Sequence, residues 1–339
     1  MTAIDSGDVR RRTVPVDPPV SGKQHKIYFG TRARMVLQIR KAVAEDIPEI
    51  MTLFNSYVNP PKSAYSFQWW NSLPSVTYCA IYQGEIVGTF IVLRRKLTNN
   101  LNCGVLMGLI VESEWRARGL FKELGDKAMS HYDDIDLFCC LTNIAGKKAL
   151  EKNFNFSTIG IVETMVIASN AYTNMDVECQ YNVCTPIASN TKFNNFKIKK
   201  EDVVMFLADE DFRLWRFALH PRYSYQMIHT DANEFVITNK YYDNETEIRY
   251  GDIVDFETPV LEENKLTDLF NCAYLGLRKD VDMVTIQAVP DSLLHAAVKR
   301  VGFVESNIRH FFCINVKDRK NDYLYDFPKW LIKWGDYLR

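Results

Sequence analysis

The sequence predicts an α/β protein with a mixed sheet, built from two tandem copies of one domain. Its 339 residues are enough for two domains of about 150 residues each. Strand and helix patterns alternate along the first half, which favours a sheet with helices on both faces. Two segments of the first half recur in the second half, in the same order. These three observations define the predicted fold class.

The elements of the first half are predicted in order from periodicity and turn residues. A strand pattern over 36–42 is followed by helical spacing of apolar residues after Asp46. Two strand patterns flank the turn Gln83-Gly84, and a longer apolar strand covers 103–112. The remaining predictions are a helix over 120–129, a buried strand over 136–143, a short helix over 145–153 and a last strand over 157–168. The predicted order is β-α-α-β-β-β-α-β-α-β.

The recurring segments indicate the second copy. "FQWWNSLP", which begins at Phe67, is echoed by "FRLWRFALHP", which begins 145 residues later at Phe212. "ALEKNFNF" is echoed by "AAVKRVGF" 147 residues later. Chance similarity of amphipathic segments is the alternative. We therefore expect a disordered extension over 1–34, a first domain over 35–168, a linker rich in Asn, Thr and Ser over 169–195, and a second domain over 196–339.

Composition narrows the function class. The chain carries 41 Lys and Arg against 42 Asp and Glu, so its charge predicts neither a nucleic-acid nor a membrane partner. The longest apolar runs fall far short of the about 18 residues that a membrane span needs. The eight cysteines show neither a CxxC framework nor zinc-ligand spacing. We expect reduced cysteines, no metal and a cytoplasmic protein.

The stretch "EWRARGLFKEL" (114–124) joins an apolar strand to a helical pattern. Backbone N–H groups are free at a helix start, and the helix dipole adds partial positive charge there. Phosphates bind at such places. Gly119 lets the backbone approach a ligand, and Arg116 and Arg118 can add charge-assisted hydrogen bonds. The alternative is a solvated basic helix start.

This stretch resembles the GNAT superfamily of acyl-CoA-dependent N-acyltransferases. In that family a strand ending in Val leads to Arg/Gln-x-x-Gly-x-Gly/Ala, and "LIVESEWRARGLF" matches it, with an Asn before the next helix at Asn143. The resemblance implies that acyl-CoA is held by Leu109, Val111, Arg116, Ala117, Arg118, Gly119, Leu120, Phe121 and Asn143, and that Asn143 also serves catalysis. In two places the sequence departs from the pattern. Phe121 replaces the final Gly/Ala, and the family's Tyr acid falls near Leu150 or Glu151, which leaves the general acid open.

The second copy lacks the motif. Shifted by the repeat, Arg116 falls opposite Glu262 and Gly119 opposite Lys265, and acidic side chains would repel a pyrophosphate. We expect this copy to be degenerate for coenzyme A and to help form the acceptor site.

The acceptor residues are expected in and near the aromatic cluster before the first hairpin. Phe67 and Trp70 are interpreted as core because of their echoes, which leaves Tyr65 and Trp69 as substrate-binding candidates. The strand before the motif has no carboxylate to act as base. His220 is the catalytic candidate for deprotonation through water, and a structural histidine is the alternative.

The overall resemblance implies a specific reaction. A "WRFALHP" segment and the ending "WLIKWGDYLR" are similar to N-acyltransferases of nucleotide-linked aminosugars for surface polysaccharides such as O-antigen or capsule. We expect transfer of an acyl group from acyl-CoA to the amine of a dTDP- or UDP-linked amino-deoxysugar by a monomer. The alternatives are acetylation of a peptide, protein or small amine, a Fem-type aminoacyl transferase, and a non-catalytic ligand-binding protein.

Overall fold

The computed structural model describes residues 37–57, 63–72, 75–171, 181–193, 203–230 and 234–336. The chain divides into two compact units, Met1–Met35 and Val36–Arg339. All described residues belong to the second unit, so the expected extension over 1–34 lies outside them. Among the described residues, no helix is both long and apolar enough to cross a membrane.

The first half contains the elements that the sequence predicts, in the predicted order. They are β1 (Gln38–Lys41), α1 (Ile47–Asn55), α2 (Ala64–Asn71), β2 (Ser75–Tyr82), β3 (Glu85–Lys96), β4 (Asn102–Val111), α3 (Leu120–Met129), β5 (Leu137–Thr142), α4 (Ile144–Phe154) and β6 (Ser157–Ala168). Short 3-10 turns cover Ala44–Asp46 and Ser113–Trp115. Both turn residues between β2 and β3, Gln83 and Gly84, have positive φ, as a tight hairpin requires.

The second half repeats the order β-β-β-α-β-α-β that follows α2, and it has an additional short strand near its start. Its elements are β7 (Tyr181–Pro186), β8 (Val204–Met205), α5 (Glu210–Arg213), a π-turn η3 (Leu214–Ala218), β9 (Tyr225–Thr230), β10 (Phe235–Asp243), β11 (Ile248–Glu257), α6 (Glu263–Leu277), β12 (Met283–Ala288), α7 (Leu293–Val301) and β13 (Val304–Val316). The chain continues through η4 (Arg319–Tyr325), η5 (Phe327–Lys329), β14 (Trp330–Leu331) and η6 (Trp334–Asp336). The predicted α/β class and tandem arrangement are confirmed.

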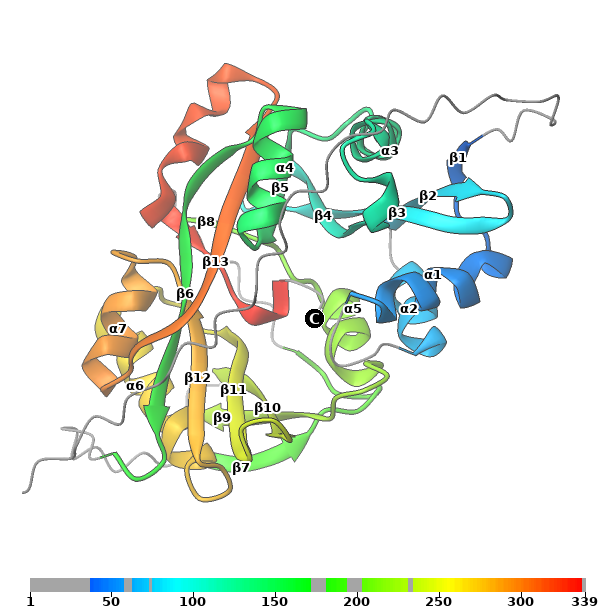
Figure 1. Ribbon diagram of the computed structural model, residues 1–339. Coiled ribbons are helices and arrows are strands. Elements are labelled where there is room, and N and C mark those ends of the chain that lie inside the picture. Colours follow the sequence, from blue (N-terminus) through cyan, green and yellow to red (C-terminus); the bar gives the residue numbers. More distant parts are fainter. Residues whose placement is uncertain are drawn as a thin grey trace, which may run out of the picture. The chain divides into compact units, whose positions relative to one another are not determined.

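The two halves share one sheet of twelve strands in the order β1-β2-β3-β4-β5-β13-β6-β12-β11-β10-β9-β7. From one edge, the order runs through β1 to β5 of the first half and then reaches β13 of the second half. From the other edge, it runs through β7 and β9 to β12 of the second half and then reaches β6 of the first half. β13 lies between β5 and β6, and β6 pairs with β12 (Figure 1). Each half therefore completes its sheet with a strand of the other half, a relation that local periodicity does not encode.

One boundary expectation needs correction. The segment 169–195, expected to be linker, contains β7, which pairs with β9 at the edge of the sheet. Its Asn, Thr and Pro content is typical of a linker, yet an edge strand tolerates Pro186 because one side of it needs no ladder hydrogen bonds.

Helices cover the sheet on both faces. In the first half, α3 and α4 pack on one face through Leu120, Leu124, Leu150 and Phe154. The apolar side chains of α1 and α2 form a separate cluster with residues of β2 and β3. In the second half, α6 and α7 share one core. Six cysteines are buried, namely Cys79, Cys103, Cys139, Cys140, Cys272 and Cys313.

Candidate functional site

The first half opens where β4 and β5 separate. These parallel strands pair only from Cys103–Leu137 to Val105–Cys139. Beyond that point the register of β4 against β3 shifts, and Gly108 adopts φ +55°. The Thr89 hydroxyl donates to the Gly108 carbonyl at 2.9 Å, which fixes this bulge. The carboxyl ends of β4 and β5 therefore diverge and leave a gap in the sheet.

The predicted phosphate cradle lies beyond the end of β4. Ala117 has φ +59° and Gly119 has φ +85°, so the turn places two left-handed residues directly before α3. Within the described part of the chain, no side chain caps this helix start. A Cβ built on Gly119 would meet no atom of the described residues within 4 Å, so they leave the space above the turn open. Successive N–H groups in such a turn form a concavity that suits an anion.

The two arginines of the motif have local contacts. Arg116 Nε donates to the Val111 carbonyl at 2.9 Å, and its guanidinium lies 5.0 Å from the ring centroid of Tyr57. Arg118 lies 5.7 Å from the Trp115 ring centroid. Arg116 therefore ties the turn to the end of β4. This role differs from the direct phosphate contact that its charge predicts.

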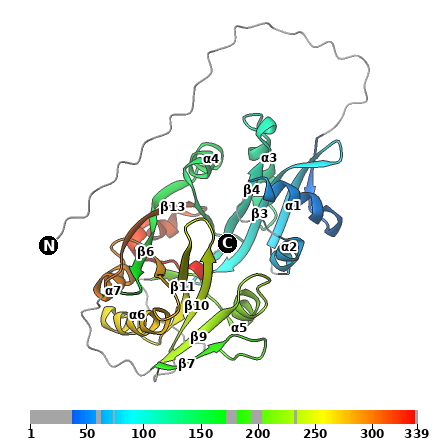
Figure 2. The same ribbon diagram turned by 60° about the horizontal axis from the view of Figure 1, so that its bottom comes forward.

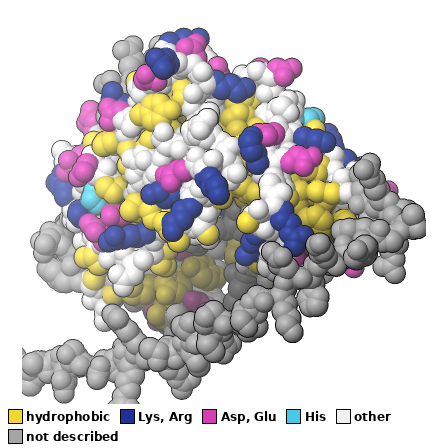
Figure 3. All heavy atoms as spheres, turned by 45° about the horizontal axis from the view of Figure 1, so that its top comes forward, with side chains coloured by type: hydrophobic (Ala, Val, Ile, Leu, Met, Phe, Trp, Pro, Cys, Tyr) yellow, Lys and Arg dark blue, Asp and Glu magenta, His cyan; other side chains and the backbone are white. Residues whose placement is uncertain are grey.

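Charge on one face of the molecule is mixed. Figure 3 shows Lys and Arg side chains interspersed with Asp and Glu on the face that it draws. An anion at this turn would therefore depend on local donors.

Phe121, which departs from the family pattern, packs beneath the helix. Its ring lies 5.7 Å from that of Phe90 and 5.5 Å from that of Phe154, centroid to centroid. The side chain thus points into the core between α3 and α4. The backbone of the turn remains uncovered.

Asn143 caps α4. Its Oδ1 accepts hydrogen bonds from Ala145 N at 3.1 Å and Gly146 N at 3.0 Å. The residue also lines the cavity described next. Asn143 therefore fixes the end of β5 and the start of α4, on the other side of the gap from Gly108.

A cavity of about 990 Å³ joins this gap to the second half. From the first half it is lined by Phe54, Trp70, the β4 segment 107–110 and the β5 end 141–143. From the second half it is lined by Arg216, Arg222, Tyr223, Tyr225, Asn239, the segment 241–245, Asp252, Val254 and His310. One wall is thus mostly apolar, and the facing wall is polar and rich in tyrosine.

A row of four buried polar residues forms the base of the polar wall. Tyr225, Asn239, Asp252 and Thr285 stand in register across β9, β10, β11 and β12. All four are at most 5% exposed, and the Thr285 hydroxyl donates to Asp252 Oδ1. Arg216 Nη1 donates to the Tyr225 hydroxyl at 2.8 Å. Buried polar groups are costly unless they are paired or used, so this row differs from an ordinary sheet core.

The two predicted acceptor residues lie elsewhere. Tyr65 is 64% exposed and does not line the cavity. Trp69 is 6% exposed and stacks on Trp215 at 4.2 Å between ring centroids. Trp69 Nε1 donates to the Trp215 carbonyl, and Trp215 Nε1 donates to the Trp69 carbonyl. Trp69 is therefore a packing residue between the halves, and its partner lies 146 residues later, one residue away from the alignment that paired Trp70 with Trp215.

Trp70 takes the place that we expected for Trp69. Adjacent residues of a helix point to different faces, so only one of the two tryptophans of α2 can face the cavity. Trp70 lines it, and its buried Nε1 has no hydrogen-bond partner among the described residues.

His220 is also outside the cavity lining. Its Nδ1 accepts from Arg222 N at 3.1 Å and from Tyr223 N at 3.0 Å. Its ring packs edge-on against Trp69, 4.5 Å between centroids. These contacts match the structural alternative for His220.

The site residues that sequence reasoning missed come from the second half. Asn239 and Asp252 interrupt apolar strand patterns, and this interruption is a signal that the sequence carries. His310 lies in a strand pattern with no such signal, because its position depends on the exchange of β13.

The gap of the second half is closed. β11 and β12 pair from Tyr250–Met283 to Ile253–Ile286 and then separate. Lys333 lies between them, and the remaining space there is too small for a water molecule. Lys333 Nζ contacts Asp255, which is buried. The side chains therefore occupy the place where the first half keeps its gap.

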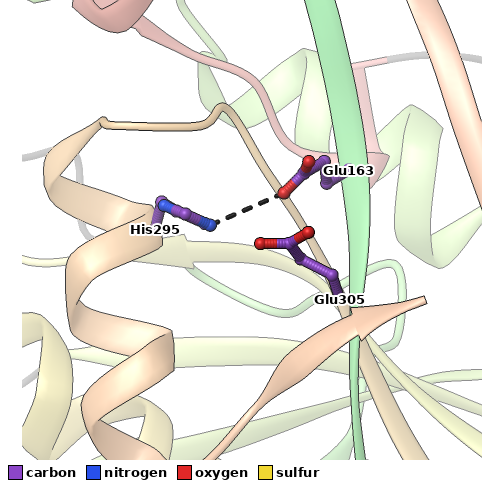
Figure 4. Close-up of side chains that lie close together, drawn as sticks. All are labelled: Glu163, His295 and Glu305. Atoms are coloured by element: carbon purple, nitrogen blue, oxygen red, sulfur yellow. Dashed lines mark ion pairs between the residues drawn. The ribbon is translucent and has the colours of Figure 1, made fainter.

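A second polar cluster lies away from the cavity. Figure 4 shows Glu163 of β6, His295 of α7 and Glu305 of β13 close together. His295 Nε2 lies 3.5 Å from Glu163 Oε2, and His295 Nδ1 accepts from Asp291 N at 3.3 Å. With Nδ1 accepting, the neutral ring carries its proton on Nε2, and a metal would need that nitrogen bare. The cluster therefore fits a polar contact between β6 and α7.

The comparisons agree on the fold. No protein-family model matches the chain, and no curated protein matches it. A GCN5-related N-acetyltransferase from Anabaena variabilis is similar at 11% identity and TM-score 0.59, over 84% of this chain and 73% of that one. A tandem GNAT protein from the clavulanic acid biosynthesis pathway is similar at 13% identity and TM-score 0.54, over 83% and 98%.

A third similar structure is N-myristoyltransferase of Saccharomyces cerevisiae with bound myristoyl-CoA, at 10% identity and TM-score 0.54, over 84% and 83% of the two chains. Identities this low establish the fold and leave the activity to the chemistry of the site. The chain has the GNAT fold, in a tandem arrangement with exchanged last strands.

Proposed function

We propose that the protein is an N-acyltransferase that moves an acyl group from acyl-CoA, held by the first half, to an amine held against the second half. The carrying observation is the single cavity that joins the diverging ends of β4 and β5 to the polar row of the second half. A donor in the gap and an acceptor on the row would meet inside one enclosure.

The donor side suits a pantetheine and a pyrophosphate. Leu109, Ile110 and Leu141 offer apolar walls beside the gap. The open turn at Ala117 and Gly119 offers backbone N–H groups to the phosphates. Asn143, Leu120 and Val111 position the two helix starts and strand ends around them. The apolar walls also suit an acyl chain.

The acceptor side suits a sugar that carries a cationic amine and a diphosphate. Tyrosine rings stack on sugar faces and nucleotide bases. Asp243, Glu245 and Asp252 supply negative charge toward an ammonium group, and Arg216 and Arg222 supply charge-assisted donors toward phosphate. We therefore keep a dTDP- or UDP-linked amino-deoxysugar as the proposed acceptor, with surface polysaccharide synthesis as its use and the cytoplasm as its place.

Two buried polar atoms of the lining support a polar ligand. Asn239 Oδ1 and Trp70 Nε1 have no hydrogen-bond partner among the described residues, although both residues face the cavity. Hydroxyl groups of a bound substrate would donate a hydrogen bond to Asn239 Oδ1 and accept one from Trp70 Nε1.

The same geometry supports two further parts of the proposal, a degenerate second copy and a monomer. Lys333 occupies the second gap, so we propose one coenzyme A site per chain. The strand exchange already brings two copies together within one chain, which supports a monomer.

The test is release of free thiol from acyl-CoA in the presence of separate pools of nucleotide-linked aminosugars, peptides and small amines. We expect release with the nucleotide-sugar pool and binding of one coenzyme A per chain by calorimetry. Release with peptides alone would replace the acceptor but keep the reaction class. Coenzyme A binding without any release would indicate a ligand-binding protein, and no binding at all would remove the proposal.

A further inference from the structure

The strand exchange delivers a histidine of the second half to the edge of the first half's gap. β13 pairs with β5 from Val316–Leu137 to Phe311–Thr142 in antiparallel register. One step further, this register sets His310 opposite Asn143, the residue at which β5 passes into α4. Both residues line the cavity.

Strand alternation explains which way His310 faces. Phe312 and Ile314 share its side of β13 and lie in a core with Val105 and Leu137. Phe311 lies on the other side, where Lys147 of α4 approaches its ring to 5.0 Å. His310 is thus on the face away from α4, the face on which the cavity opens.

We infer that His310 is the catalytic base that accepts the proton of the acceptor's ammonium group. This inference rests on the proposed function and names a group that it leaves open. An imidazole is the side chain best suited to take a proton near neutral pH. Asp252 already accepts the Thr285 hydroxyl in the polar row, and His220 lies outside the lining. His310 is the histidine that borders both the gap and the polar row.

The step balances as follows. His310 takes one proton from R–NH3+, and the neutral amine attacks the thioester carbonyl carbon. The C–N bond forms, the C–S bond breaks, and the second N–H proton leaves the nitrogen and neutralises the thiolate of coenzyme A. The products are the amide and coenzyme A thiol, and His310 returns its proton to solvent.

Other charged groups border the same enclosure. On the elements around it these are Arg216, Arg222, Tyr223, Tyr225, Tyr241, Tyr242, Asp243, Glu245 and Asp252, and next to His310 Arg309 of β13 stands opposite Glu163 of β6 in the strand register. Carboxylates, phenols and guanidinium groups titrate outside the neutral range unless they are perturbed, so among the protein groups around the cavity the imidazole is the one expected to change the rate within that range.

The experiment compares His310→Gln with His131→Gln, using the acceptor found by thiol release. His131 is exposed at the end of α3 and lies outside the cavity lining. We expect His310→Gln to lower kcat about 10²- to 10⁴-fold, the range of general base catalysis, with unchanged coenzyme A affinity. Its pH–rate profile should lose the rise between about pH 5 and 8 that the wild type shows. His131→Gln should match the wild type in all three measurements.

A full rate with His310→Gln, or a neutral-range rise that survives in it, overturns the inference. The wild-type profile is a second, variant-free measurement: a rate that does not fall on acidification from pH 8 to pH 5.5 excludes a neutral-range base. Thermal melting identifies an unfolded variant, in which case His310→Asn and the wild-type profile decide. Failure of the proposed function looks different, because the wild type itself would then release no thiol.

Discussion

The two gaps of the sheet have similar strand geometry, but the first gap is open and side chains fill the second. β4 ends at Leu109, Ile110 and Val111, and β11 ends 146 residues later at Asp255, Phe256 and Glu257. Both strands carry a register shift just before these ends. In the first half the gap opens into the cavity, whereas in the second half Lys333 fills it. Two apolar residues of the first half therefore correspond to two carboxylates of the second.

The carboxylates of the second half belong to a buried ion network. Asp255 contacts Lys333 and lies 3.6 Å from Arg213, and Arg213 also contacts Glu257. Burial alone would raise the pKa of Asp255, but Lys333 and Arg213 hold it below its usual value. The buried charges of this gap are balanced by one another, and an uncharged thioester would not balance them.

The segment from Lys333 to Asp336 connects the second half to the first. Arg95 of β3 lies 3.7 Å from Asp336, and Asp336 Oδ2 accepts from Lys333 N at 2.9 Å. The last described residues thus lie between the halves (Figures 1 and 2). One copy thus has an open gap, while the other has a buried contact that joins the halves.

The largest expected effect tests this buried contact. Lys333→Met should lower the free energy of unfolding by about 3 kcal/mol, because it leaves the buried Asp255 with one cationic partner, Arg213. Chemical denaturation measures the change. Coenzyme A affinity should stay the same, since Lys333 belongs to the closed gap.

Lys329→Met in the same segment is the control for Lys333→Met. The Lys329–Asp326 pair is exposed, so its loss should cost at most about 0.5 kcal/mol. The double change Lys333→Met with Asp255→Asn should recover part of the stability, because no unpaired carboxylate remains. Equal losses from the two lysine changes would contradict the role assigned to the closed gap.

The next effect is a pH dependence from Asp336. Burial raises the pKa of Asp336 to about 6, despite Lys333 and Arg95, above its ordinary value of 3.8. The folded state therefore keeps a proton that the unfolded state has lost, and the stability that this provides is present below about pH 4 and lost as the pH rises through about 6. Asp255 acts in the opposite sense, because its pKa is depressed, and its contribution is lost only below about pH 4.

Asp336→Asn removes this dependence. Between pH 4 and pH 7 the wild type should lose about 2 to 3 kcal/mol through this group, and the variant should not. Urea unfolding at a series of pH values measures the difference between the two slopes. Parallel curves for the wild type and the variant would show that Asp336 does not titrate in this window.

Local features of the first half were predictable from the sequence. The bounds of α3 and β6 match the periodicity, and the turn at Gln83 and Gly84 follows from its residue types. The motif turn at Gly119 was predicted as an open helix start, and the structure has one there. Each of these depends on neighbouring residues alone.

The acceptor side was less predictable, because it depends on long-range register. We predicted that Trp69 binds substrate and that Trp70 packs in the core, whereas in the structure Trp69 packs against Trp215 and Trp70 lines the cavity. The predicted repeat alignment paired Trp70 with Trp215, one residue away from the observed partner Trp69. His310 reaches the gap only through the strand exchange, and the polar row forms only when four strands are in register. No local pattern specifies either arrangement.

The smallest effect on stability is the sharpest test of the open gap, and it uses two glycines with the same backbone. Gly119 has φ +85° and Gly84 has φ +88°, and a Cβ on either would meet no atom of the described residues within 4 Å. Alanine at either position should therefore cost about 1 kcal/mol, from the left-handed backbone alone. The two variants should melt at similar temperatures.

Only the Gly119→Ala variant should lose ligand. The new methyl group would stand in the concavity of N–H groups before α3, so we expect coenzyme A affinity to fall about tenfold, or about 1.4 kcal/mol. Gly84→Ala, in the hairpin between β2 and β3, should bind as the wild type does. Calorimetric titration of both variants measures this. Since neither methyl group meets an atom of the described part of the chain, a loss specific to Gly119 would indicate contact with the ligand, and equal affinities would place coenzyme A elsewhere.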